Sequence, residues 1–513
     1  MERAVARIEE AVQKKEPIAI FGDYDVDGVS STCLLRDFFN FLGHPVRHRL
    51  PNRLLEGYGL RAESLRSLAA EGVRLVITVD NGSSAYEEVE VARSLGLDVV
   101  ITDHHHPPPE LPRAAAFVNP LAPESRYPFR GLAGVGVTFK LVWALSQRFS
   151  KQKKVSEEFR TFLVESLALV ALGTISDVVP LVGENRVLAK FGLQALEKTR
   201  RPGLRKLVEC ALDLDGGGRL NAGHVGFRLG PRINAAGRLG KAEAAIDLLL
   251  AREEKDALVL AEALETANRR RQEIEREMLV TARELVQSTV DLSSDRAIVL
   301  GRSEWHAGVI GIVAAKIAEE FSRPTLLISL EKGRARGSAR SVPGVHICEA
   351  LAACGHLLDG FGGHAMAAGV EMDPTRVDLL RAALNRAILR DPAEMAPETE
   401  VDAEVRLSDL TLETLAELAL LEPHGHGNPE PTFISRNVTV AGEPRTMGDR
   451  GQHLSFYARQ DRTVARAVAF GRGAEAEPLR RNGAQVTLVY RPRLSRWQGS
   501  QELELHVLDF VEE

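Results

Sequence analysis

Residues 21–28 read Phe21-Gly22-Asp23-Tyr24-Asp25-Val26-Asp27-Gly28, with three acids enclosed by glycines. The apolar residues 17–21 predict a short buried strand that runs into this stretch, and residues 30–42 predict a helix with an apolar face. The acids therefore lie where a strand passes into a helix. Because ligands bind at that edge of open α/β sheets, the stretch predicts a ligand site in an α/β fold.

The three carboxylates are crowded enough to require a cation. Mg²⁺ and Mn²⁺ are hard ions that take carboxylate oxygens. Asp23 and Asp25 are two residues apart, so extended backbone points both side chains to the same side. Asp27 either joins them or caps the following helix, and both interpretations stay open.

Two further strands repeat this arrangement. Residues 74–79 (RLVITV) end at Asp80, and residues 98–102 (DVVIT) end at Asp103, which is followed by His104, His105 and His106. A helical segment rich in Glu and Ala lies between them, and this alternation predicts a parallel sheet with right-handed crossovers. All three strand ends then meet at one edge. Imidazole among carboxylates fits Mn²⁺ better than Mg²⁺ alone. His106 is expected in a solvated loop.

A fourth acid follows an apolar helix. Residues 131–145 predict a glycine-rich turn and a helix without a phosphate-binding glycine pattern, which favours close helix packing. Residues 159–175 predict a strongly apolar helix that ends at Asp177, shortly before Pro180. Asp177 is our candidate for a further carboxylate ligand, although an isolated acid there would be an ordinary helix-end residue.

Composition limits the class of protein. The chain has 513 residues, 44% hydrophobic and 27% charged, which is typical of roughly three soluble domains. With a net charge of −6, any nucleic acid must be bound by local basic patches. Four scattered cysteines indicate buried thiols in a reducing compartment. The charged helix expected over residues 1–16 is not a signal peptide, and no apolar run is expected to span a membrane, so we expect a cytoplasmic protein.

The middle of the chain predicts a basic segment and a connector. Residues 230–238 (GPRINAAGR) carry two arginines and an asparagine and predict a phosphate-contacting loop, with a helix entry as the alternative. Residues 242–287 predict one long helix or two abutting helices that connect domains. The basic cluster 268–271 on it is expected to be a solvated face rather than a nucleic-acid contact.

A second strand–helix–strand pattern begins at residue 296 and ends at residue 331. The small and hydroxyl residues of 337–344, with one arginine, predict a phosphate-binding nest, the alternative being a hairpin turn. Residues 361–369 contain Gly362-Gly363-His364 and predict an anion site at a helix start.

The C-terminal part predicts a small β-barrel. Residues 397–403 form an expected linker, and strands are expected over 433–440, 465–470, 485–490 and 502–510. Residues 490–493 and 496–497 offer aromatic and basic groups for a single strand of nucleic acid. His424 and His426 are expected in a packed turn rather than a metal site.

The motifs DYDVDG, VDNG, DHH and ISDVVPL, in this order, resemble the DHH phosphoesterase superfamily, and the whole length resembles its RecJ family of single-strand-specific exonucleases. The resemblance implies a two-metal centre with Mn²⁺ or Mg²⁺, and it places His105 beside the metals. Phe21 stands where some members have a histidine, which implies an incomplete shell around one metal. The implied metal ligands are Asp23, Asp25, Asp80, His104 and Asp177.

The resemblance also implies the domain order. We expect a parallel-sheet DHH domain (1–205), an active-site loop with a long connector helix (206–290), a second α/β, DHH-associated domain (291–395) and an OB-like barrel (396–513). The implied nucleic-acid-binding residues are Arg232, Asn234, Arg238, His306, Ser338, Arg340, Gly363 and His364.

The function implied is 5′-to-3′ exonucleolytic hydrolysis of single-stranded DNA in repair and recombination. Asp80 would bridge two ions, and His104 and His105 would act with it in catalysis. Two alternatives stay open: a phosphodiesterase for short oligonucleotides or cyclic dinucleotides, and a non-catalytic DNA-binding scaffold. The expected partners are single-stranded DNA, a single-strand-binding protein and a helicase, and the chain is expected to be a monomer.

Overall fold

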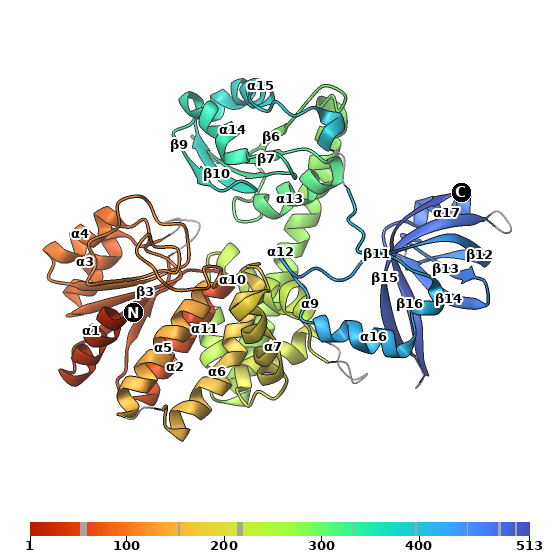
Figure 1. Ribbon diagram of the computed structural model, residues 1–513. Coiled ribbons are helices and arrows are strands. Elements are labelled where there is room, and N and C mark those ends of the chain that lie inside the picture. Colours follow the sequence, from red (N-terminus) through yellow and green to blue (C-terminus); the bar gives the residue numbers. More distant parts are fainter. Residues whose placement is uncertain are drawn as a thin grey trace. The chain divides into compact units, whose positions relative to one another are not determined.

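The computed structural model describes residues 1–51, 59–151, 154–212, 219–331, 333–395, 398–448, 450–480, 484–497 and 500–512. The chain divides into two compact units, residues 1–397 and 398–513, each with a core of its own (Figure 1). The α/β class and the C-terminal barrel predicted from the sequence are confirmed.

The N-terminal sheet is entirely parallel, with the strand order β2-β1-β3-β4-β5. Alternate strand residues face two cores. Ile18 and Ile20 pack with helices α1, α2 and α5, while Ala19 and Phe21 pack with α3 and α4. Figure 1 shows the sheet and these helices. Burial on both faces explains why the strands read as continuous apolar runs. The elements are β1 (Ile18–Phe21), β2 (Arg47–Arg49), β3 (Leu75–Val79), β4 (Asp98–Thr102), β5 (Ala116–Val118), α1 (Glu2–Gln13), α2 (Val26–Phe41), α3 (Ala62–Ala70), α4 (Tyr86–Ser94) and α5 (Gly134–Ser150).

A helical layer completes this domain and leads away from it. It contains α6 (Glu157–Ser176), α7 (Gly183–Glu197), α8 (Pro202–Ala211), α9 (Ala222–His224), the π-helical turn Val225–Leu229, α10 (Gly230–Arg238), α11 (Glu243–Leu250) and α12 (Glu254–Thr289). The predicted connector is therefore two helices. The loop predicted over 230–238 is wrong, because Pro231 stands in the first turn of α10, where its missing N–H costs nothing.

Helix α6 contradicts the expectation that no apolar segment reaches spanning length. It is long and apolar enough to cross a membrane, but 61% of that apolar window is buried. It packs against α2, α5 and α7, as the core helix of a soluble protein does.

The second domain has a mixed sheet in the order β6-β7-β8-β10-β9, in which only the β6–β7 pair is parallel. The elements are β6 (Ile298–Arg302), α13 (Ile310–Phe321), β7 (Thr325–Glu331), β8 (Arg334–Arg340), α14 (Ile347–Ala353), β9 (Gly360–Gly363), β10 (Ala367–Met372) and α15 (Val377–Ala387). Two predictions are wrong here. Ser338 and Arg340 lie on strand β8 rather than in a nest, and His364 lies in the β9–β10 hairpin rather than at a helix start.

The C-terminal unit is a barrel closed by pairing of β12 with β15, and β11 adds to β12. Helix α16 (Leu412–Leu418) lies between β11 and β12 in the chain. The strands of this unit are β11 (Ala403–Glu404), β12 (Phe433–Met447), β13 (His453–Gln460), β14 (Thr463–Ala469), β15 (Gln485–Trp497) and β16 (Ser500–Glu512). Strand β13 was not predicted. His424 and His426 belong to a turn held by a Gly425–Asn428 bridge.

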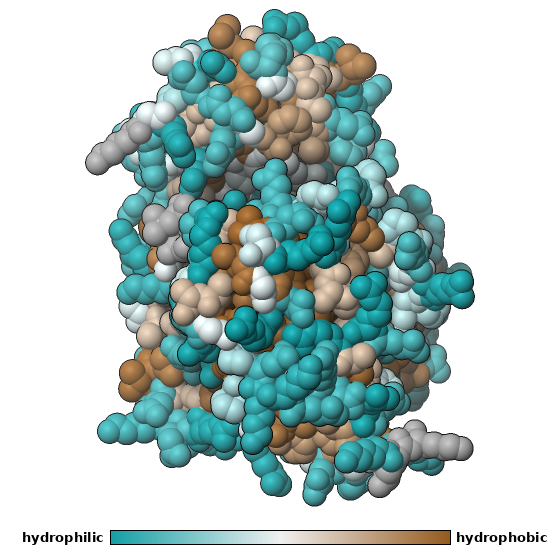
Figure 2. All heavy atoms as spheres, turned by 90° about the vertical axis from the view of Figure 1, so that its left-hand side faces the viewer, coloured by the Kyte–Doolittle hydropathy of each residue, from teal (hydrophilic) through white to brown (hydrophobic). Residues whose placement is uncertain are grey.

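The four cysteines form no disulfide. Hydrophilic residues predominate on the face drawn in Figure 2, and hydrophobic residues appear there as separate groups.

Candidate metal centre and nucleic-acid sites

The turn between β1 and α2 aims its acids by backbone hydrogen bonds. The Asp25 side chain caps α2, accepting from the N–H groups of Asp27 at 2.9 Å and Gly28 at 3.1 Å. A side chain at Gly28 would lie 2.6 Å from the Asp23 backbone, so the turn closes only with glycine there. Asp23 is buried beside it.

Asp27 caps a helix, but it is α5 rather than α2. Its two carboxylate oxygens accept from the N–H groups of Gly134 at 2.6 Å and Val135 at 2.7 Å. Burial, followed by the charge of Asp25, raises the pKa of Asp27 to about 7. A carboxylate at a helix N-terminus is stabilised by the helix dipole, and here it also lies at the centre of the acidic cluster.

Asp80 lies at the end of β3 in a left-handed backbone conformation, with φ of 63°. A Cβ atom at position 134 would lie 2.6 Å from Asp80 Oδ1. The first residue of α5 can therefore lie this close to Asp80 only because it is glycine. Burial raises the pKa of Asp80 well above its ordinary value, and the charges of Asp27 and Asp25 add to the rise. Burial and the same two charges likewise raise the pKa of Asp177.

Asp103 orients the two histidines that follow it. Its Oδ1 accepts from the backbone N–H groups of His104 at 2.8 Å and His105 at 3.2 Å, and it lies 2.8 Å from His105 Nδ1. Burial acts against the charge of Asp103, but the hydrogen bonds from His105 and Ser83, together with the charges of His105 and His104, outweigh it and the pKa falls to about 2. Asp103 is therefore a support for the histidines.

His104 points into the acidic cluster. Its Nε2 lies 3.2 Å from Asp80 Oδ1, 3.6 Å from Asp177 Oδ2 and 3.9 Å from Asp27 Oδ2. Burial, followed by the charge of His105, lowers its pKa to about 4. The imidazole is therefore neutral at physiological pH, the form that ligates metals.

The side chains form three groups whose ligand atoms lie within 4.8 Å of one another: Asp80, His104 and His105; Asp27, His104 and Asp177; and Asp23, Asp25 and Asp80. The last two groups share no residue, so together they can hold two ions. Oxygen donors with a neutral imidazole fit Mn²⁺ and Mg²⁺. The structure thus brings all five sequence-predicted ligands together and adds Asp27, whose signal in the sequence was its place in the DYDVDG run.

The predicted residues of the second domain lie in two neighbouring elements. Arg340 Nη1 lies 3.0 Å from Ser338 Oγ on β8, and a side chain at Gly311 in α13 would touch both. The His364 ring centroid is 6.1 Å from that of His106. His106 is exposed in a loop, as expected, and its ring lies near His364 of the β9–β10 hairpin.

The three residues of α10 predicted to bind nucleic acid have different surroundings. Arg232 is paired with Glu265 at 2.6 Å, which turns it toward α12. Arg238 donates to Gly308 O at 3.1 Å, two residues from His306, and Asn234 is half-buried. Helix α10 thus touches both domains of the first unit, since a side chain at Gly237 would meet Tyr24 O at 2.7 Å.

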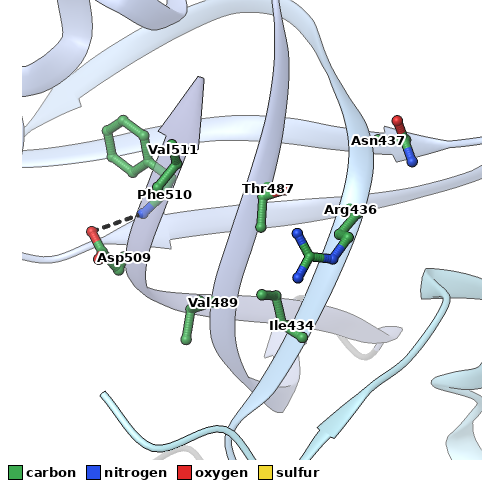
Figure 3. A pocket seen from close by; sticks show the side chains of 8 residues that line it. All are labelled: Ile434, Arg436, Asn437, Thr487, Val489, Asp509, Phe510 and Val511. Carbon is green, nitrogen blue, oxygen red and sulfur yellow. Dashed lines mark hydrogen bonds between the residues drawn. The ribbon is translucent and has the colours of Figure 1, made fainter. Parts of the chain in front are cut away.

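The barrel has a hollow of about 550 Å³ on β12, β15 and β16, lined by Arg436, Phe510 and their neighbours (Figure 3). Tyr490, predicted to stack on a base, is fully buried and bonded to Ser435 Oγ at 2.7 Å, so that prediction is wrong. Burial raises its pKa to about 12. Arg493, from the same run, pairs with Glu430. The side chains predicted at 496–497 lie outside the described residues.

Three family models match the chain: the N-terminal domain of the DHH family over residues 17–174, the DHHA1 domain over 294–389 and the RecJ OB domain over 401–509. Among curated proteins, the single-stranded-DNA-specific exonuclease RecJ of Escherichia coli is 35% identical, over 98% of this chain and 89% of its own length.

RecJ of Bacillus subtilis is 38% identical over 99% of this chain, which spans 63% of that protein's length. The crystal structure of RecJ from Thermus thermophilus in complex with Mn²⁺ matches with a TM-score of 0.84 and 34% identity, over 99% of this chain and 71% of that one. The acidic centre, the domain order and these matches agree: the chain belongs to the RecJ family of single-stranded-DNA-specific exonucleases.

Proposed function

We propose that this chain hydrolyses phosphodiester bonds of single-stranded DNA from the 5′ end, with two divalent ions, and that it acts in DNA repair and recombination. The observation that carries the proposal is the pair of separate ligand groups, Asp27–His104–Asp177 and Asp23–Asp25–Asp80, at one edge of the parallel sheet. Two ions bound there would supply an activated water and stabilise the leaving oxygen.

The protein's own residues prepare this chemistry. Asp80 would hold one ion with Asp23 and Asp25, and its Oδ1 lies 3.2 Å from Nε2 of His104, which would hold the other ion. Burial lowers the pKa of His105, but the hydrogen bond and the charge of Asp103 raise it above its ordinary value, which favours the protonated imidazole that would stabilise charge on a bound phosphate. Ser338, Arg340, Gly363 and His364, with Arg232, Asn234, Arg238 and His306, form the proposed nucleic-acid contacts.

The oligomeric state, the location and the protein partners are proposed from membership of the family. A monomeric, cytoplasmic enzyme would receive its strand from a helicase or a single-strand-binding protein. The hollow of the barrel, lined by Arg436, Phe510 and other apolar side chains, offers a surface for the strand downstream of the cut (Figure 3).

The test uses a single-stranded oligonucleotide labelled at its 3′ end, with Mn²⁺, and compares the protein with Asp80→Ala. We expect a ladder of progressively shorter labelled products, and a loss of at least about a hundredfold in the variant. Asp378→Ala, an exposed acid on α15, is the matched control. Binding without cleavage in both proteins would favour a scaffold, and cleavage of only the shortest oligomers would favour a small-substrate phosphodiesterase.

A further inference from the structure

Asn185, in the first turn of α7, is a polar residue outside the acidic cluster, and it is completely buried. Its Nδ2 donates to two backbone carbonyls, Gly131 O at 2.5 Å and Pro180 O at 3.1 Å. Its Oδ1 is buried and has no hydrogen-bond partner among the described residues. Because burying an unpaired oxygen lowers stability, the two N–H bonds, rather than packing, explain an asparagine at this position.

The first of the two carbonyls belongs to the turn that leads into α5. The next residue of this turn, Leu132, accepts a hydrogen bond from the His104 ring on its backbone oxygen. His104 Nε2 has no hydrogen-bond partner among the described residues, so Nδ1 makes this bond and the lone pair of Nε2 is left for a metal. The same turn ends at Gly134, whose N–H binds Asp27. It therefore places two of the three members of one ligand group.

The second carbonyl closes the turn after α6, which carries Asp177. Val178, directly after Asp177, has a φ of 61° and is 65% exposed. A β-branched residue is strained in this left-handed conformation, and an exposed side chain gains little packing that would hold it there. The turn therefore depends on contacts from outside, and the bond from Asn185 to Pro180 O supplies one.

The first turn of α7 binds the segment before α5 at three successive positions. A Cβ atom at Gly183 would lie 2.8 Å from the Phe129 ring, and Glu184 accepts from Tyr127 Oη at 2.8 Å. Asn185 follows with its bond to the same segment and extends the contact to the turn after α6. The two turns are thus connected through one amide group.

We propose, building on the two-ion function above, that Asn185 is a positioning residue for one of the two ions. Its amide ties together the turns that place His104 and Asp177, which belong with Asp27 to the same ligand group. The other ligand group lies on the turn after β1 and at the end of β3. Loss of the Asn185 amide should therefore weaken the binding of one ion and spare the other.

A purely structural asparagine would lower stability without this selectivity. Asn385 on α15 is the matched control, because its Nδ2 also donates to two backbone carbonyls, Ala297 O and Arg381 O, both at 3.1 Å. These bonds hold the segment before β6 in the second domain. The same substitution at the two asparagines therefore separates metal positioning from general destabilisation.

The test is a calorimetric Mn²⁺ titration of the full chain, fitted to two sites, with Asn185→Leu and Asn385→Leu. Leucine is similar in shape to asparagine and lacks both N–H donors. In Asn185→Leu we expect one ion to bind at least about tenfold more weakly and the other to change by less than about threefold. Cleavage by this variant should recover at high Mn²⁺ concentration, whereas Asn385→Leu should keep both affinities.

Two double variants assign the affected ion. Asp177→Asn impairs one ligand group and Asp23→Asn the other. Added to Asp177→Asn, the substitution Asn185→Leu should change Mn²⁺ affinity by less than about twofold, because the ion that it serves is already weakened. Added to Asp23→Asn, it should weaken the remaining ion by the full factor of about ten.

A milder variant covers the case in which Asn185→Leu does not fold. Tyr127→Phe removes only the hydrogen bond to Glu184, which holds the same segment on α7. It should weaken the same ion by roughly threefold.

Equal weakening of both ions by Asn185→Leu, or no change in either, would overturn the proposal. The same selective loss in Asn385→Leu would overturn it as well, because it would follow from destabilisation alone. The proposed function fails separately: two bound Mn²⁺ ions without any cleavage in the unaltered chain would refute the nuclease and leave the role of Asn185 measurable.

Discussion

Asp80 shows at the scale of one residue how the metal centre opposes stability. Four other carboxylates raise its pKa in addition to burial, so the metal-free site holds a repulsive charge. We therefore expect Asp80→Asn to raise the free energy of unfolding at pH 8 in EDTA by at least about 1 kcal/mol. Urea denaturation measures this, with the exposed Asp378→Asn as control. A lower free energy of unfolding in EDTA would contradict the repulsion, and Mn²⁺ should stabilise the unaltered chain more than the variant.

The pH dependence of stability follows from the same residues. The pKa of Asp27 is raised to about 7 and those of Asp80 and Asp177 are raised as well, so the native state binds protons that the unfolded state releases. The contribution of Asp27 is complete below about pH 4 and is lost as the pH rises through about 7, and those of Asp80 and Asp177 are lost in the same direction. His104, whose pKa is lowered to about 4, acts in the opposite direction between pH 4 and 6.5, but it is one group against three.

The measurement is the free energy of unfolding in EDTA as a function of pH. This cluster should make the curve fall between about pH 4 and 7, and Mn²⁺ should stabilise more at pH 8 than at pH 5, because ligands must lose their protons to bind. The variant Asp80→Asn/Asp177→Asn should flatten the fall. An unchanged slope in that variant would show that other groups determine it.

At the scale of elements, α10 joins the metal centre to the second domain. Arg238 donates to Gly308 O, and a side chain at Gly308 would lie 2.3 Å from Arg238 O and 3.1 Å from the His306 ring. Gly308→Ala should therefore displace the turn that carries His306 and lower kcat/KM by about tenfold, with Mn²⁺ affinity unchanged. Steady-state kinetics and calorimetric Mn²⁺ titration test this. Gly226→Ala, which meets no atom within 4 Å, is the control.

Elements also show why some sequence predictions were wrong. Residues 337–344 and 361–369 contain the small residues typical of turns, yet β8, β9 and β10 run through them because their neighbours in the sheet supply the hydrogen bonds. Strand propensity depends on what a strand packs against, and a local window does not contain that information.

At the scale of the whole molecule, the two units have separate cores. Among the described residues, the buried core of the barrel lies between residues 407 and 507, and the buried cores of the first unit lie before residue 396. We expect the fragment 398–513 to fold alone and to bind oligo(dT), and the fragment 1–397 to retain metal-dependent cleavage with KM raised at least about tenfold. Circular dichroism and steady-state kinetics measure these effects. An unchanged KM would remove the barrel from substrate binding.

The sequence by itself determined the parallel sheet and the acids at the ends of its strands, because alternation and strand-end acids are local patterns that the chain carries in order. The set of five proposed ligands came from the resemblance of these motifs to the family. Only the tertiary structure decided that Asp27 binds the N-terminal amides of α5, more than a hundred residues away, and that Tyr490 lies in the barrel core rather than on its surface. Both depend on which distant segment packs against the residue, and that is settled by burial of the whole chain rather than by local spacing.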